Sequence, residues 1–344
     1  MKKRTWIAAL AVAVLLAGCS ESTAEEPAER DVPEKENEEK PDEAFAEVTY
    51  TGPYTGLEME TEPDMRPVLA TLNNHPQARP QSGLAEADVI YEMLAEYEVT
   101  RLLALYQSEM AETLGPIRSA RDYFIELAGG HGAIFITHGQ SPEAKSLLDS
   151  GAVDHLNGIR YEGTLFFRSK DRKAPHNSYI SEDAVFSGAQ DSGFRMDNPK
   201  DPGWRFDPEP PTGGEASAEA DVTYGRFPNF NSRYVFDPNN ASYTRFAGGE
   251  ETVDAAGDKP VRLANVLILE VPHRVIDDKG RRSLDLTAGG EAAVLRSGLV
   301  YQATWEMRDG IPTVMDGDQP FALAPGKTWI HLVPDIADTL THHP

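Results

Sequence analysis

The sequence contains a single cysteine, Cys19, among its 344 residues. Once Cys19 is modified, such a chain has no disulfide, no thiolate metal site and no cysteine nucleophile. Basic residues are also scarce, because 32 Lys and Arg stand against 56 Asp and Glu and leave a net charge of −24 at pH 7. This charge argues against nucleic acid as a partner and against electrostatic adhesion to anionic lipids or wall polymers.

Long apolar runs are missing except at the N-terminus. The basic segment 2–4 precedes an apolar stretch, 6–16, that is too short for a comfortable membrane span. The next residues, Leu16-Ala17-Gly18-Cys19, resemble a bacterial lipobox. The resemblance implies removal of residues 1–18 as a lipoprotein signal peptide and lipidation of Cys19, with palmitate as the expected acyl group. We therefore expect an anchor on the extracytoplasmic face of the cell membrane; the alternative is an ordinary signal peptide with an incidental cysteine.

Residues 19–50 have almost no large apolar side chain before Phe45 and are rich in Glu, Asp, Pro, Lys and Ala. Such a segment cannot bury enough surface to offset its conformational entropy, so we predict an acidic disordered tether. A flexible coil of this length spans roughly 30 Å. The tether would hold a folded part near the membrane.

From residue 51 to 187, short apolar strands alternate with helical patterns, which predicts an α/β or α+β domain. We expect strands at 68–72, 87–94, 100–106, 133–137 and 164–168, and helices at 118–127 and 141–148. Ser141 and Pro142 form a typical helix start. Because the first strands lie too close together for crossover helices, we predict a mixed sheet.

Residues 188–220 are rich in Pro and Gly and predict a linker, part of which docks through Trp204 and Phe206. Residues 221–335 predict a mainly antiparallel β domain, with turns between strand-like runs at 234–236, 243–246, 265–271, 293–296, 299–305 and 328–333. Residues 336–344 are interpreted as a C-terminal tail in which His342 and His343 are disordered.

Four basic or amide-rich clusters follow predicted strand ends in the first domain. In chain order they are Asn73, Asn74, His75 and Arg79; Arg118 and Arg121; His138, Gln140 and Ser141; and Arg168, Arg172, Lys173, His176 and Asn177. Three residues separate Arg118 from Arg121, so both would lie on one face at the start of the helix predicted there, beside free backbone N–H groups.

Ligands bind at the carboxyl ends of strands in open α/β sheets, so we hypothesise that these clusters form one anion site. The ligand of this anion site would be phosphate, pyrophosphate or carboxylate. The candidate contacts are Arg118, Arg121, His138, Arg172, His176 and Asn177. The alternative for each cluster is structural, with arginines bracing loops or pairing with nearby carboxylates, as Arg101 would with Glu92 or Glu96.

Motifs throughout the chain resemble the YerB-like lipoprotein family of Firmicutes. In the first domain they are Asn74-His75, Arg79-Pro80-Gln81-Ser82-Gly83-Leu84, Ala87-Asp88, Tyr91-Glu92, Thr100-Arg101, Gly115-Pro116-Ile117-Arg118-Ser119-Ala120-Arg121, His138-Gly139, Arg172 and Ala174-Pro175-His176-Asn177. In the second they are Trp305, Arg308, Asp316-Gly317 and Pro325-Gly326-Lys327-Thr328-Trp329-Ile330. The resemblance implies a two-domain extracytoplasmic lipoprotein with a role in the cell envelope.

These observations favour a binding or accessory module over an enzyme, with an anionic envelope ligand or a cell-wall synthesis protein as partner. No Gly-x-Ser-x-Gly or His-Glu-x-x-His motif is present, and we predict neither a metal nor a cofactor. One alternative is an enzyme acting on lipid-linked or wall-derived phosphate substrates, since segment 118–121 loosely resembles the arginine-bearing loops of LytR-CpsA-Psr enzymes. Paired aspartates for the metal of such chemistry are not evident. Another alternative is a scaffold for penicillin-binding or divisome proteins without a small ligand.

Overall fold

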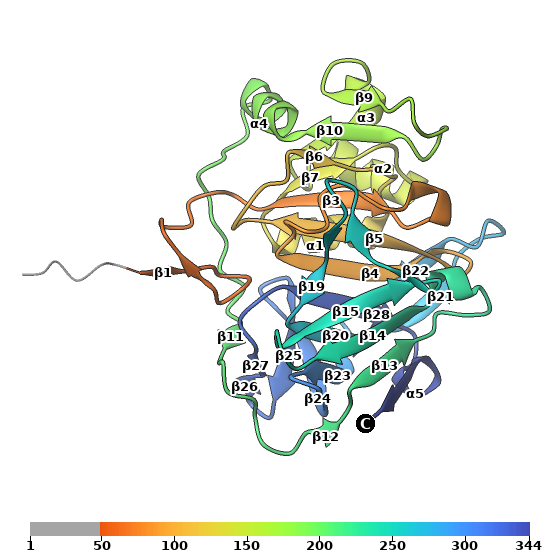
Figure 1. The fold of residues 1–344 in the computed structure, drawn as a ribbon. Coiled ribbons are helices and arrows are strands. Elements are labelled where there is room, and N and C mark those ends of the chain that lie inside the picture. The colour runs from red at the N-terminus through yellow and green to blue at the C-terminus, as the bar shows by residue number, and fades with distance from the viewer. Residues whose placement is uncertain (1–48) are drawn as a thin grey trace, which may run out of the picture. The chain divides into compact units, whose positions relative to one another are not determined.

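A mixed sheet of 12 strands runs through the structure, a computed structural model that describes residues 49–344 (Figure 1). In chain order its strands are β3 (Val68–Asn73), β4 (Val89–Glu96), β5 (Val99–Tyr106), β7 (Ile134–Thr137), β8 (His155–Asn157), β12 (Glu215–Ala216), β20 (Asn265–Glu270), β23 (Gly290–Arg296), β24 (Leu299–Arg308), β25 (Ile311–Asp316), β26 (Gln319–Pro320) and β28 (Thr328–Val333). The spatial order is β26-β25-β24-β23-β20-β28-β4-β5-β3-β7-β8, and β12 pairs with β24. The predictions for the signal peptide, Cys19 and the tether up to residue 48 lie outside the described residues.

The sheet joins the two halves of the chain through β28. This strand lies parallel to β20 on one side and parallel to β4 on the other, with Thr328 opposite Val89 and Leu332 opposite Met93. All six residues of β28 are buried, as expected for a strand inside a sheet that is covered on both faces. Antiparallel pairs β4–β5 and β3–β5 adjoin parallel pairs β3–β7 and β7–β8, which confirms the predicted mixed pairing.

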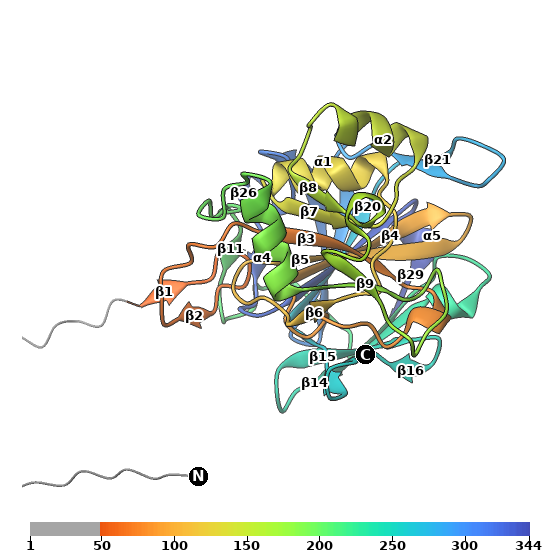
Figure 2. The same cartoon turned by 90° about the horizontal axis from the view of Figure 1, so that it is seen from above.

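Helices cover both faces of the sheet at its β3–β7–β8 end (Figure 2). Helices α1 (Asp122–Gly130) and α2 (Pro142–Asp149) pack on one face, where their apolar side chains join Leu69 and Phe135 in one core. Helix α4 (Glu182–Asp191) packs on the other face, against a second core that contains Ala70 and Ile136. Alternation along β3 and β7 therefore separates the two cores. The short helices are η1 (Pro76–Ala78), α3 (Gly158–Tyr161), η2 (Pro228–Phe230) and α5 (Ile336–Thr339).

Smaller sheets surround the central one. An antiparallel sheet of six strands contains β13 (Glu219–Val222), β14 (Ser232–Asp237), β15 (Ser242–Ala247), β16 (Glu250–Glu251), β19 (Arg262–Leu263) and β29 (Leu340–His343). A three-stranded sheet contains β6 (Thr113–Leu114), β9 (Phe166–Arg168) and β10 (Ser178–Ser181). The two-stranded pairs are β1 (Tyr50–Thr51) with β2 (Glu58–Met59), β11 (Arg205–Phe206) with β27 (Ala322–Leu323), β17 (Val253–Asp254) with β18 (Lys259–Pro260), and β21 (His273–Val275) with β22 (Arg282–Leu284).

The structure corrects the predicted start of the first helix. Helix α1 begins at Asp122, so Arg118 lies before the helix and Arg121 is its N-cap. Segment 117–120 is held extended instead: the N–H of Arg118 donates to Thr71 O at 2.8 Å, and that of Ala120 donates to Gly139 O at 2.9 Å. These bonds to neighbouring segments use the N–H groups that a helix start would leave free.

The C-terminal tail is also more ordered than the sequence suggested. The prediction of disorder at His342 and His343 is wrong, because both belong to β29, which pairs with β13. By contrast, the predicted docking of the Pro-rich segment through Trp204 and Phe206 is confirmed, since both side chains pack against the core around α1. That segment also contributes β11 and β12. No helix within residues 49–344 is long and apolar enough to cross a membrane.

Candidate functional site

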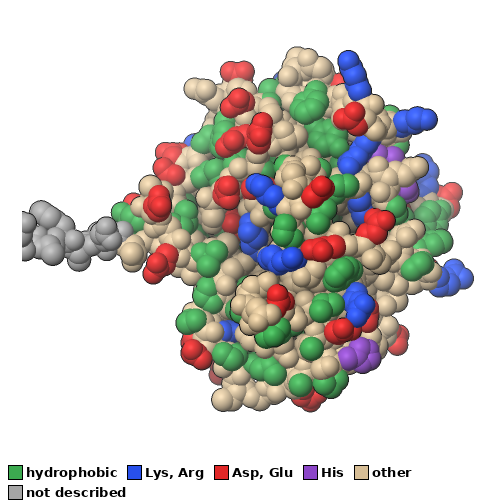
Figure 3. Space-filling model, viewed as in Figure 1, with side chains coloured by type: hydrophobic (Ala, Val, Ile, Leu, Met, Phe, Trp, Pro, Cys, Tyr) green, Lys and Arg blue, Asp and Glu red, His purple; other side chains and the backbone are tan. Residues whose placement is uncertain are grey.

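Basic and imidazole side chains gather at the carboxyl ends of the parallel strands β3 and β7. We call this set the histidine–arginine cluster; its members are Asn73, His75, Arg118, His138, Arg168 and His176. Asn73 ends β3, His75 caps η1, and His138 follows β7 directly, while Arg168 and His176 come from the hairpin of β9 and β10. Figure 3 shows histidine and basic side chains side by side at one edge of this half of the molecule.

Hydrogen bonds fix the tautomers of two neighbouring imidazoles, those of His176 and His75. Asn73 Oδ1 accepts the backbone N–H of His75 at 3.0 Å, which leaves Asn73 Nδ2 to donate to His176 Nδ1 at 2.8 Å. His75 Nδ1 accepts the Gln77 N–H at 3.2 Å. A neutral imidazole that accepts at Nδ1 carries its proton on Nε2. Both histidines therefore keep an Nε2–H group that no side-chain or backbone acceptor in residues 49–344 engages, and their rings stack with centroids 4.5 Å apart.

Arg118 is half-buried beside these rings. Within residues 49–344, its guanidinium takes part in no side-chain hydrogen bond and no ion pair, and only its backbone is fixed, by Thr71. Burial and the neighbouring Arg101 lower its pKa to about 10, so the group is still charged at neutral pH. Burial lowers the pKa of His75 and, with the stacked His75 ring, that of His176; Arg118 lowers both further. Both imidazoles are therefore neutral N–H donors near neutral pH.

His138 occupies a different setting in the same cluster. Its Nδ1 lies 2.6 Å from Ser178 Oγ, and its Nε2 lies 3.1 Å from Arg168 Nη2 and 3.3 Å from Glu162 Oε2. Because a guanidinium only donates, Nε2 of the neutral ring accepts and Nδ1–H donates to Ser178. Burial and Arg168 lower the pKa of His138, which favours this neutral form. In this tautomer His138 cannot remove the Ser178 proton.

Arg121 does not join the cluster as predicted. Its side chain is only 6% exposed and forms an ion pair with Glu96, a carboxylate that Arg101 also contacts at 2.7 Å. Its Nη1 donates to Ala120 O. The structural alternative therefore describes Arg121 and Arg101, and the ligand-contacting role hypothesised for Arg121 loses its geometric basis.

Arg172 and Asn177 are also engaged by the protein. Arg172 donates to the carbonyls of Ala78 and Pro80, each at 2.6 Å, and to Tyr179 Oη at 2.9 Å. Asn177 is buried; its Nδ2 donates to Ser169 O at 3.1 Å, and its Oδ1 accepts from Arg168 at 3.3 Å. These two residues brace the loop that carries His176, and Arg172 adds positive charge, since it forms no ion pair within the part of the chain that the structure describes.

The candidate list drawn from the sequence omitted residues that the structure brings together. His75 and Asn73 were visible as a polar cluster after a strand, and their position at a strand end was the available signal. Ser178 and Glu162 carried no signal, because each becomes relevant only when hairpin β9–β10 folds against His138.

A second polar group lies buried at the junction of the two halves. Glu92 on β4 is fully buried and forms an ion pair with Arg245 on β15 at 2.8 Å. The carboxylate also accepts from Asn74, Thr100 and Trp329, and the Arg245 guanidinium lies 4.2 Å from the Trp329 ring centre. Its partners come from both halves of the chain, so this network stabilises their contact.

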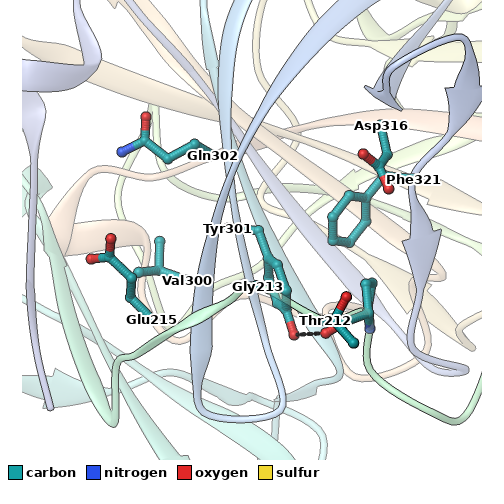
Figure 4. A pocket seen from close by; sticks show the side chains of 9 residues that line it. Thr212, Gly213, Glu215, Val300, Tyr301, Gln302, Asp316 and Phe321 are labelled. Atoms are coloured by element: carbon teal, nitrogen blue, oxygen red, sulfur yellow. Dashed lines mark hydrogen bonds between the residues drawn. The ribbon is translucent and has the colours of Figure 1, made fainter.

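Two cavities in the described part of the chain are not lined by His75, Arg118 or His176. One of about 180 Å³, between segment 211–215 and β24, is shown in Figure 4, where Tyr301 Oη donates to Pro211 O at 2.9 Å. Its charged lining residues, Glu215 and Asp316, are acidic. A larger cavity of about 600 Å³ lies along the edge strand β8 and mixes acidic and basic groups. In residues 49–344, no three or more His, Cys, Asp or Glu side chains are grouped as metal ligands.

Comparisons with known proteins cover nearly all of the described chain. Residues 54–195 match the family described as "Protein of unknown function (DUF3048) N-terminal domain", and residues 220–330 match the DUF3048 C-terminal domain. A Bacillus subtilis (strain 168) protein named "Putative lipoprotein YerB" is 43% identical over 288 residues, which are 83% of this chain and 86% of that protein. The crystal structure of the YerB protein from Bacillus subtilis matches with a TM-score of 0.78 and 40% identity, over 85% of this chain and 99% of that one. The chain therefore belongs to the DUF3048 family of YerB-like proteins and carries both the N-terminal and the C-terminal domain of that family.

Proposed function

We propose that the protein is a lipid-anchored module of the cell envelope that binds an anionic group at the histidine–arginine cluster. The observation that carries the proposal is the set of free donors there. His75 and His176 each keep an Nε2–H group, and both lie beside Arg118, a charged guanidinium without a protein partner in residues 49–344. The protein already fixes the tautomers of both imidazoles, so these donors lose little conformational freedom when a ligand binds. N–H donors beside a positive charge favour an anionic ligand.

The anchor rests on the lipobox that ends at Cys19 and on the lipoprotein name of the relative. Lipidation at Cys19 would hold the folded part at the extracytoplasmic face of the membrane. A ligand from the envelope, or an acidic segment of a cell-wall synthesis protein, is then the natural partner. The expected role is accessory rather than catalytic.

Thermal unfolding tests the binding proposal. The chain from residue 19, carrying Cys19→Ala for solubility, is melted with phosphate, pyrophosphate, citrate and muropeptides. A ligand at a hundred times its dissociation constant should stabilise the protein by about 2.7 kcal/mol. Arg118→Gln should abolish the shift, whereas Arg274→Gln, which removes an exposed arginine on β21, should keep it. The proposal fails if no anion shifts the transition, or if both variants respond like the parent.

Catalysis on lipid-linked or wall-derived phosphate is a second candidate, and one observation favours it. Glu162 Oε2 lies 3.3 Å from His138 Nε2, within reach for orienting a general base. The Arg168 side chain, however, donates to the same Glu162 at 2.6 and 2.9 Å, and the neutral tautomer of His138 points its proton at Ser178. Hydrolysis of p-nitrophenyl phosphate, with and without Mg²⁺, that is lost in His138→Gln would favour this candidate.

A further inference from the structure

The charge around the stacked imidazoles is unbalanced in a way that constrains the ligand. Three arginines, Arg79, Arg118 and Arg172, lie close enough to lower the pKa of at least one of the two rings, after the effect of burial. None of the ion pairs in residues 49–344 involves any of the three. In a chain of net charge −24, three arginines that form no ion pair within the described residues make a local positive site.

The hydrogen-bond partners of Arg79 and Arg172 are neutral groups. Arg79 donates to Asn74 Oδ1 at 3.2 Å and to the carbonyls of Asn74 and Asn229 at 2.8 and 2.7 Å. Arg172 donates to two carbonyls and a tyrosine hydroxyl. Neutral acceptors satisfy the N–H groups but cancel no charge. Glu92 and Glu250 offset part of the Arg79 charge, whereas the Arg172 guanidinium still attracts an anion near His176.

From these contacts we infer that the group bound at the cluster is a phosphoryl group, a terminal phosphate carried on an ester, rather than a carboxylate. This inference rests on the proposed function, because it names the ligand class of the same site. The shared chemistry fits a lipid-linked phosphate as well as a free phosphate ester.

The donor set separates the two classes of anion. When both oxygens of a carboxylate face one guanidinium edge, only their two outer lone pairs remain for the Nε2–H groups of His75 and His176. A terminal phosphate offers three strong acceptor oxygens and carries a charge of about −1.5 to −2 near pH 7. It can therefore engage Arg118 and both imidazoles together, and it offsets more of the surplus positive charge than a single carboxylate does.

Titration calorimetry with matched small ligands tests the inference. Methyl phosphate and acetate, which share a methyl group, are titrated at pH 7.5 into the chain from residue 19 carrying Cys19→Ala. We expect methyl phosphate to bind about tenfold or more tightly than acetate. Arg118→Gln and His176→Phe should each remove most of that preference, and Arg274→Gln should retain it.

The outcomes are distinguishable. Equal binding of acetate and methyl phosphate, lost in Arg118→Gln, overturns the phosphoryl assignment and leaves the anion site intact. Binding of neither ligand, nor of pyrophosphate, overturns both. A further arm compares glycerol phosphate in solution with geranyl phosphate in phosphatidylcholine vesicles. Tighter binding of the vesicle ligand supports a lipid-linked phosphate, and equal binding supports recognition of the phosphate alone.

Discussion

The substitution Glu92→Gln should be among the most destabilising single changes in this protein. Glu92 is fully buried and pairs with Arg245, whose side chain is 2% exposed. Two unit charges about 4 Å apart attract by about 4 kcal/mol at an effective dielectric constant of about 20. Removing one partner of a buried pair costs about 3–5 kcal/mol, because the remaining charge stays buried without compensation.

Hydrogen bonding adds to this loss. Oε1 of Glu92 accepts from Asn74 and Thr100, and Oε2 accepts from Arg245 and Trp329. An NH₂ group at the Oε2 position would face Arg245 and Trp329, which only donate. At the Oε1 position it would face the Asn74 amide N–H and the Thr100 hydroxyl, which can turn to accept, so either orientation loses at least one hydrogen bond. We therefore expect a loss near the upper end of the range, about 4–5 kcal/mol.

Urea unfolding followed by tryptophan fluorescence measures this loss. With a slope of about 3 kcal/mol per molar, the midpoint should fall by more than about 1 M. The matched control is Glu219→Gln, which breaks a surface pair with Arg233 whose side chains are 39% and 51% exposed, and it should cost less than about 1 kcal/mol. A loss for Glu92→Gln as small as that of the control would refute the reasoning.

The same pair predicts a pH dependence. Burial opposes ionisation of Glu92, but Arg245 and the hydrogen bond from Thr100 outweigh it and lower the pKa of the carboxyl. A carboxyl with a lowered folded pKa stabilises the protein above its unfolded pKa of about 4.3, and this stabilisation is lost as the pH falls through the folded value. The difference between parent and Glu92→Gln should thus stay constant from pH 7 to 5 and shrink only in stronger acid.

Three further changes have clear expected outcomes. Gly130→Ala would place a methyl group against the Gly310 carbonyl oxygen, far inside van der Waals contact, and should lower the free energy of unfolding by about 3 kcal/mol or more, as thermal unfolding would measure. The control is Gly129→Ala, one position earlier in α1. Its new methyl group meets only a valine methyl at 3.6 Å, so this change should be neutral or stabilising. Cys19→Ala should move the protein from the membrane fraction to the soluble fraction on cell fractionation. A chain that stops at residue 217 lacks β28 and leaves β4 with an open edge, so it should aggregate or show no cooperative unfolding transition.

Local patterns were sufficient for the strands and for one helix start. Strands β3, β4, β5 and β7 are dense apolar runs, and each lies close to its predicted place. Ser141 caps α2 as its sequence signature predicts, with its Oγ accepting the Ala144 N–H at 3.2 Å. Such features depend on neighbours a few residues apart, which a sequence displays directly.

Pairing between distant segments could not be predicted in this way. The run 328–333 predicts a strand, but nothing local indicates that it lies parallel to β4, more than 230 positions earlier in the chain. The different contacts of Arg118 and Arg121 could not be predicted for the same reason. Arg118 and Arg121 look equivalent in the sequence, and only the fold places Glu96 against Arg121 while the Arg118 side chain has no partner among residues 49–344.

The overall acidity and the local positive site together narrow the class of ligand. A long polyanion would carry its charges across the surface of an acidic protein, whose 344 residues have a net charge of −24, so repulsion along its length would oppose the attraction at Arg118. In the proposed site, a single terminal phosphate meets Arg118 and the field of the two neighbouring arginines without spanning that surface. Affinity for the small ester should then weaken with salt more than affinity for a neutral ligand would, while a teichoic-acid chain should bind less tightly than its own terminal phosphate unit. The acidic background therefore favours recognition of an end group over recognition of a polymer.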